Sequence, residues 1–200
     1  LHPEKGPAGE DLYLDFGTVG PDDASGALVL ISGTHGPELF AGSGAQTAFL
    51  NSGMIEGFED LKVVLVHAHN PYGSAWLRRT DHHNIDLNRN YYDFSKPFTP
   101  HPGYDKLRPI IVPDEWNTNE VAQGMASYEE EHGKVGLLAA MVTGQSHDPE
   151  GMFYRGEGPA WSRIQMETYL PELTAQQDIV SVIDFHTGLG PYGVPYIVHG

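Results

Sequence analysis

The chain has 200 residues, a length that suits one domain or most of a larger one and allows a sizeable buried core. Its formal net charge of −16 argues against nucleic-acid binding, which needs a basic face. There is no cysteine, so disulfides, thiolate metal ligands and cysteine nucleophiles are excluded, and the absence is consistent with a cytoplasmic protein. No apolar run is long enough to cross a membrane. The eleven histidines are therefore the obvious nitrogen ligands for a metal.

Strand and helix patterns alternate in the first third of the chain. Residues 12–16 alternate apolar and polar side chains, which favours a half-buried strand. The apolar runs 27–31 and 61–66 predict buried strands, and the small-residue segment 39–50 between them predicts a helix. This order indicates an α/β fold with parallel strands and with sites at the carboxyl ends of those strands.

The middle of the chain is expected to be less regular. Residues 73–117 are polar and rich in proline and histidine, and a loop of this length in a compact domain is usually functional. Asn117 or Thr118 is a candidate cap for a helix that runs towards Glu131, and residues 135–142 predict a second helical segment.

The last part of the chain returns to regular structure. Residues 160–170 predict a helix that Pro171 interrupts or restarts, and residues 179–185 predict a third buried strand. Residues 196–200 have the pattern of a strand cut off as it ends, so we expect the chain to be a piece. No repeat or linker divides it, and residues 1–200 are expected to form one domain.

Each of the three predicted buried strands ends in a turn that carries histidine. His35 follows the first strand, His67 and His69 follow the second, and His186 follows the third. The carboxyl ends of parallel neighbours meet at one edge of a sheet, so these side chains are expected to lie along that edge.

His35 and Glu38 lie three residues apart where the first buried strand gives way to a helix. Zinc in hydrolytic sites takes three His or carboxylate ligands and leaves a fourth position for water. His186 is the best third ligand, because a strand end far along the chain can fold back beside the first. The alternative is a capping Glu beside a surface His.

The segment Asp86-Leu87-Asn88-Arg89-Asn90 suits the binding of a carboxylate. Arginine forms two parallel hydrogen bonds to a carboxylate, and the Asn88 amide can add another. The alternative is that Arg89 is structural and bonds loop carbonyls.

Taken together, residues 33–38, 86–90 and 184–187 resemble the zinc carboxypeptidase superfamily, which includes carboxypeptidase A-type peptidases and aspartoacylase-like relatives. Residues 70–79 and 186–193 look like a poorly characterised, mostly bacterial branch of carboxypeptidase-like proteins. The resemblance implies a single catalytic domain with a three-layer α/β/α fold around a central, mostly parallel mixed sheet.

The resemblance also implies the members of a site. One Zn²⁺ would be bound by His35, Glu38 and His186, and the substrate carboxylate by Asn88 and Arg89.

An arginine upstream of this clamp would polarise the scissile carbonyl and stabilise the oxyanion. Arg78 and Arg79 both match, with a slight preference for Arg79, and Asp86 matches the carboxylate that orients the first zinc histidine through its other ring nitrogen.

One part of the family pattern is missing from the chain. The family's general base is a Glu well downstream of the third ligand, whereas only fourteen residues follow His186 and none of them is Glu. We expect the base to lie in a C-terminal part that this chain lacks, which would leave this fragment inactive alone.

The predicted function is zinc-dependent hydrolysis of an amide bond next to a free carboxylate, with a metallocarboxypeptidase as the leading interpretation. One alternative is a deacylase of N-acyl amino acids, similar to aspartoacylase or succinylglutamate desuccinylase. Another is a non-catalytic zinc-binding module. The expected partner is a peptide or N-acyl amino acid with a free carboxylate, and neither nucleic acid nor a membrane.

Overall fold

The computed structural model describes residues 1–98, 101–188 and 190–198. In this part of the chain, six α-helices accompany one open four-stranded sheet with the order β1-β3-β2-β4. β1 is antiparallel to β3, whereas β2 is parallel to both β3 and β4, so the predicted mixed and mostly parallel sheet is confirmed. The strands are β1 (Asp15–Val19), β2 (Gly26–Ile31), β3 (Leu61–His67) and β4 (Ile179–Asp184).

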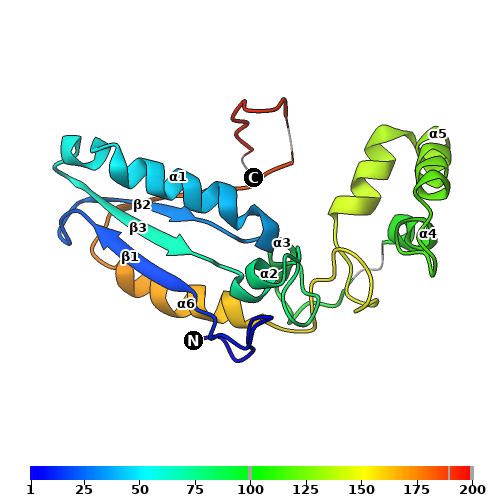
Figure 1. Cartoon of the computed structure of the whole chain (residues 1–200), viewed down its shortest axis with the longest axis horizontal. Helices are drawn as coiled ribbons and strands as arrows, with labels where there is room; N and C mark the ends of the chain where they lie inside the picture. Colours follow the sequence, from blue (N-terminus) through cyan, green and yellow to red (C-terminus); the bar gives the residue numbers. More distant parts are fainter. Residues whose placement is uncertain (99–100, 189, 199–200) are drawn as a thin grey trace.

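Two helices cover opposite faces of the sheet, α1 (Leu39–Asn51) on one side and α6 (Trp161–Leu173) on the other (Figure 1). Such an arrangement is compatible with a three-layer α/β fold. Alternate residues of a strand point to the same face. The core on the α6 face accordingly contains Val29 and Ile31 of β2, their partners Val64 and Val66 of β3, and Met166 of α6.

On the opposite face, the buried side-chain amide of Gln46 bonds α1 to the sheet. Gln46 donates from Nε2 to the carbonyls of Leu30 at 2.9 Å and Val66 at 3.0 Å, and its Oε1 accepts from the Ser32 hydroxyl at 3.0 Å. A Cβ added to Gly42 would lie 2.7 Å from the Ser32 Cβ, so the helix can approach this closely only with small residues. The predicted helix over 39–50 is confirmed to within one residue.

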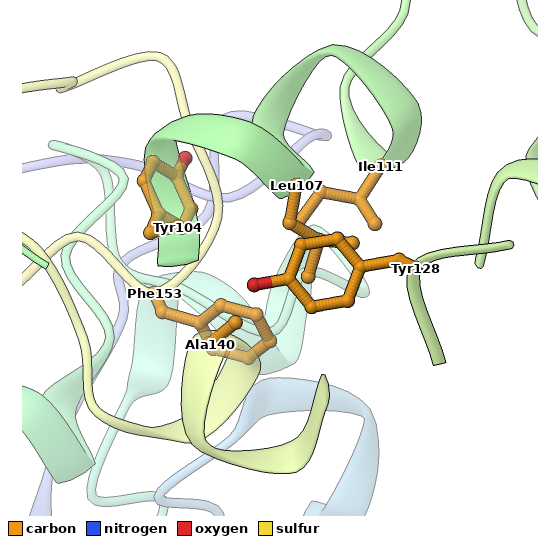
Figure 2. Packing of buried hydrophobic residues seen from close by; sticks show 6 residues of the cluster. All are labelled: Tyr104, Leu107, Ile111, Tyr128, Ala140 and Phe153. Carbon is orange, nitrogen blue, oxygen red and sulfur yellow. The ribbon is translucent and has the colours of Figure 1, made fainter. Parts of the chain in front are cut away.

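A helical region stands beside the sheet and has its own core (Figure 1). It contains α4 (Pro102–Ile111) and α5 (Thr118–Val142). Figure 2 shows the buried side chains that hold it together, which are Tyr104, Leu107, Ile111, Tyr128, Ala140 and Phe153.

The prediction of a long loop over 73–117 is therefore wrong. This segment contains α4 and the short α3 (Leu87–Asn90), and it begins inside α2 (Pro71–Ala75). Each of these helices begins at a side-chain cap, and α2 and α4 also have proline in the first turn, where a missing N–H costs nothing. Proline and polar residues mark helix starts here.

The predicted helices in the second half are confirmed with modified bounds. The two segments of α5 join across a kink at Gly133, whose φ of 73° is not helical. α6 continues past Pro171 to Leu173, so the predicted interruption at that proline is wrong.

Three strand predictions need correction. The first strand is shifted from 12–16 to β1. β4 is present but not buried: Ile179 is 70% and Val182 58% exposed, because β4 pairs only with β2 among the described residues. Residues 196–198 form no strand, and residues 199 and 200 lie outside the described part. No helix in the described ranges is both long and apolar enough to span a membrane.

Candidate metal and carboxylate site

A cavity of about 610 Å³ opens at the carboxyl ends of β2 and β4. Six residues proposed from the sequence line it together, which are His35, Glu38, Arg79, Asn88, Arg89 and His186. Asp86 lies fully buried nearby, and Arg78 is not among the lining residues. Segments 150 residues apart in the sequence thus share one cavity, as parallel strand ends allow.

The turn after β2 carries the first two candidate ligands and depends on two glycines. Gly33 has a φ of 75°, in the left-handed region that other residues rarely adopt. A Cβ on Gly36 would lie 1.9 Å from the carbonyl carbon of Gly73, so the turn and the start of α2 are in backbone contact. The short 3-10 helix Gly36–Glu38 then directs Glu38 into the cavity.

His186 lies between two carboxylates. Its Nε2 is 2.8 Å from Asp184 Oδ2, and its Nδ1 is 3.0 Å from Glu38 Oε2. The bonds to Asp184 and Glu38 raise the pKa of His186 to about 9, against the opposing effect of burial. Burial alone would raise the pKa of Glu38, but the bonds from His186 and from the Thr187 backbone N–H lower it. The result is a charged, hydrogen-bonded arrangement at the end of β4.

His35 is buried, and burial lowers its pKa despite the nearby Asp86 carboxylate. Its Nε2 accepts from the Asn88 amide at 3.3 Å. Its Nδ1 has no hydrogen-bond partner in the part of the chain that the structure describes, and it lies 3.9 Å from Asp86 Oδ1, which is longer than a hydrogen bond. Asp86 therefore faces the outer nitrogen of His35, as the resemblance implies, without bonding it here.

Asp86 organises the carboxylate-binding segment instead. It caps α3 by accepting from the Asn88 backbone N–H at 3.0 Å, and it accepts from Arg79 Nε at 3.2 Å. Arg89 follows Asn88 in the helix, and its buried Nε has no partner within residues 1–98, 101–188 and 190–198. Burial lowers the pKa of its guanidinium. Asn88, Arg89 and Arg79 thus present donors to one cavity, which suits a carboxylate and a neighbouring polarised carbonyl.

The three candidate ligands are of types that zinc takes, and two of them already stand at a suitable separation. Two ligands on a tetrahedral zinc lie roughly 3.3 Å apart, given bonds of about 2.0–2.1 Å, and Nδ1 of His186 and Oε2 of Glu38 are separated by 3.0 Å. The ring of His35 lies 5.0 Å from that of His186 between centroids. Within the described ranges, no three His, Asp or Glu side chains already converge as a finished metal site. Metal binding would therefore need His35 to move towards the other two.

Sequence reasoning missed two contributors to the site, Asp184 and Thr34, and missed the role of a third, His69. Asp184 bonds His186, Thr34 bonds Asp184, and His69 bonds Thr34. A signal for Asp184 was present, since it lies two residues before His186 at a strand end, where alternate residues share a side. Thr34 gave no such signal. His69 was expected at this edge of the sheet, but its bond to Thr34 joins different strands and leaves no local pattern.

The cavity wall also includes residues that no motif indicates. Val142, the last residue of α5, and Val194 to Tyr196 line it beside the charged groups. The end of the helical region therefore forms part of the site.

No curated protein and no solved structure matches the chain. A family model described as "Protein of unknown function (DUF2817)" matches residues 1–200, and the chain belongs to that family.

Proposed function

We propose that this protein is a zinc-dependent hydrolase of the zinc carboxypeptidase superfamily, which cleaves an amide bond next to a free carboxylate. The observation that carries the proposal is the meeting of His35, Glu38 and His186 in one cavity with Asn88 and Arg89. Cleavage of a terminal residue requires metal ligands close to the groups that bind the terminal carboxylate. The mixed sheet between two helical layers agrees with the same superfamily.

In the proposed site His35, Glu38 and His186 hold the metal. When bound there, zinc would supply Lewis-acid polarisation of the carbonyl and would lower the pKa of a bound water. Asp184 bonds Nε2 of His186 and would hold the proton on that nitrogen, so Nδ1, which bonds Glu38 in this structure, would be the nitrogen that gives up its proton to face the metal.

Three other side chains act on the substrate. Asn88 and Arg89 bind its carboxylate and fix the scissile bond over the metal ligands. Arg79, which lines the cavity while Arg78 does not, stabilises the negative charge that develops on the carbonyl oxygen. Neither Glu38 nor Asp184, the carboxylates among the described residues that line the cavity, is assigned as the proton shuttle, because both bond His186.

The test is the zinc content of the purified protein and of His35→Ala, with His132→Ala as the matched control. His132 lies on α5, in the helical region, and pairs with Glu131. We expect about one zinc per chain in the wild type and the control, and a large loss in His35→Ala. Equal zinc in His35→Ala and the wild type would contradict the proposal.

A second arm tests the clamp. Arg89→Ala should keep its zinc and weaken the binding of ligands that end in a carboxylate, seen as a higher Kd, whereas Arg78→Ala, outside the cavity lining, should change neither. An unchanged Kd in Arg89→Ala would remove this role. Assays of the full-length protein with both peptides and N-acyl amino acids then separate a carboxypeptidase from a deacylase. Zinc binding without either activity in the full-length protein would favour a non-catalytic zinc-binding module.

A further inference from the structure

A chain of hydrogen bonds joins the ends of three strands directly behind the cavity. The Thr34 hydroxyl, which follows β2, lies 2.9 Å from each carboxylate oxygen of Asp184, the last residue of β4. The same hydroxyl lies 3.0 Å from Nδ1 of His69, which follows β3. Asp184 in turn accepts from Nε2 of His186 at 2.8 Å. The network therefore connects β3 and β2 to a proposed zinc ligand beyond β4.

The chemistry of these groups fixes the direction of each bond. An ionised carboxylate can only accept, so the Thr34 hydroxyl donates its single proton to Asp184. The Thr34 oxygen must then accept from His69, which places the proton of that imidazole on Nδ1. Among the described residues Nε2 of His69 is buried without a partner, which agrees with an unprotonated nitrogen. Burial lowers the pKa of His69 to about 4, so the ring is neutral near pH 7.

The network is also held rigidly. Thr34 is 1% and His69 3% exposed, so water does not compete for these bonds. The segment that carries His69 is tied to the turn after β2 by two backbone bonds of 2.9 Å, from His69 N to Ser32 O and from Asn70 N to Gly33 O. The His69 ring therefore stays at the Thr34 hydroxyl, and the hydroxyl stays at Asp184.

We propose that Thr34 is a positioning residue of the zinc site. Its hydroxyl, oriented by His69, holds the Asp184 carboxylate against Nε2 of His186 and so keeps Nδ1 of His186 facing Glu38. The zinc part of this inference rests on the proposed function, whereas the order of the hydrogen bonds belongs to the protein itself. Groups that bond the outer nitrogen of a ligating histidine set its tautomer and ring orientation.

The first test is zinc affinity, measured by competition with a chelating dye, for the wild type, Thr34→Val and Thr34→Ser. Valine keeps the shape but cannot donate, so affinity should fall about 10–100-fold. Serine keeps the hydroxyl and should restore affinity close to that of the wild type. The matched control is Thr174→Val at the end of α6, which also loses a hydroxyl bond, 2.8 Å long, to the Leu170 carbonyl. Its affinity should not change.

Two results of this test would overturn the positioning role. One is wild-type zinc affinity in Thr34→Val. The other is a Thr34→Ser variant that binds as weakly as Thr34→Val, since the hydroxyl would then not be the active group.

The second test needs neither zinc nor a variant. In ¹⁵N-histidine NMR of the metal-free wild type near pH 7, His69 should appear as the neutral tautomer with its proton on Nδ1. A proton on Nε2 would reverse the order of the bonds and overturn the inference. If the wild type binds no zinc, the proposed function fails, and the NMR result still decides the hydrogen-bond order on its own.

Discussion

The site end of the sheet and the helical region of α4 and α5 are held together by different kinds of contact. In the helical region the buried cluster is aromatic and aliphatic, with Tyr104, Leu107 and Ala140 almost fully buried (Figure 2). At the site end of the sheet, Thr34, Asp86, Asn70 and Asn90 are buried just as completely although all four are polar. The part that carries the proposed chemistry is thus the part with the polar interior.

Asn90 shows what this difference means. It donates to the carbonyls of Arg155 at 2.7 Å and Gly158 at 2.9 Å, and it accepts from the Ala160 N–H at 2.8 Å. Apolar packing has no preferred direction, whereas each of these bonds requires one partner in one place. Directional contacts therefore position the residues of the cavity, and apolar burial holds the helices beside it.

The largest expected effect is a loss of stability when the backbone contact between the turn after β2, which carries His35 and Glu38, and the start of α2 is disrupted. Gly36→Ala places a Cβ 1.9 Å from the Gly73 carbonyl carbon, which the two backbones can relieve only by separating. The free energy of unfolding should fall by about 3 kcal/mol or more in urea denaturation. The control is Gly44→Ala in α1, where nothing lies within 4 Å and alanine should stabilise by about 0.5–1 kcal/mol. A Gly36→Ala protein as stable as this control would contradict the close approach.

The second prediction tests whether the helical region is energetically separate. Leu107 is fully buried in its core, and Leu107→Ala should cost about 2–5 kcal/mol of local stability through lost burial and a cavity. Hydrogen exchange should accelerate in α4 and α5 while the amides of β2 and β3 keep their protection. Equal loss of protection in β2 and β3 would show that the two regions unfold as one unit.

The smallest expected effect is a dependence of the free energy of unfolding on pH, caused by His2 near the N-terminus. The buried His2 ring lies 4.8 Å from His82 and 4.7 Å from Trp161 between centroids, and burial, followed by the charge of His82, lowers its pKa from 6.5. Below pH 6.5 His2 therefore takes up a proton more readily in the unfolded chain than in the folded chain. The contribution of His2 to the free energy of unfolding is retained above pH 6.5 and is lost as the pH falls below it.

This dependence is expected to stay below about 1 kcal/mol, because a single partly screened group is involved. The measurement compares the free energy of unfolding of the wild type and His2→Phe above and below pH 6.5. The wild type should lose more stability on acidification than the variant. An identical loss in both proteins would assign the dependence to other groups.

Local patterns predicted the elements whose sequence is continuous and apolar. β2 and β3 were predicted to within a residue, since an unbroken apolar run needs burial on both faces. The pattern failed for β4, which is equally apolar but exposed, because pairing and covering are not local properties. It also failed for α4, where proline and histidine mark a helix start rather than a loop.

The sequence by itself determined that His35, Glu38 and His186 would meet, because parallel strands bring their carboxyl ends to one edge. The tertiary structure alone decided that Arg79 rather than Arg78 lines the cavity, since the two are adjacent and chemically identical. It also decided that Thr34 joins His69 to Asp184, because that contact unites three strands and depends on distances that no local pattern contains.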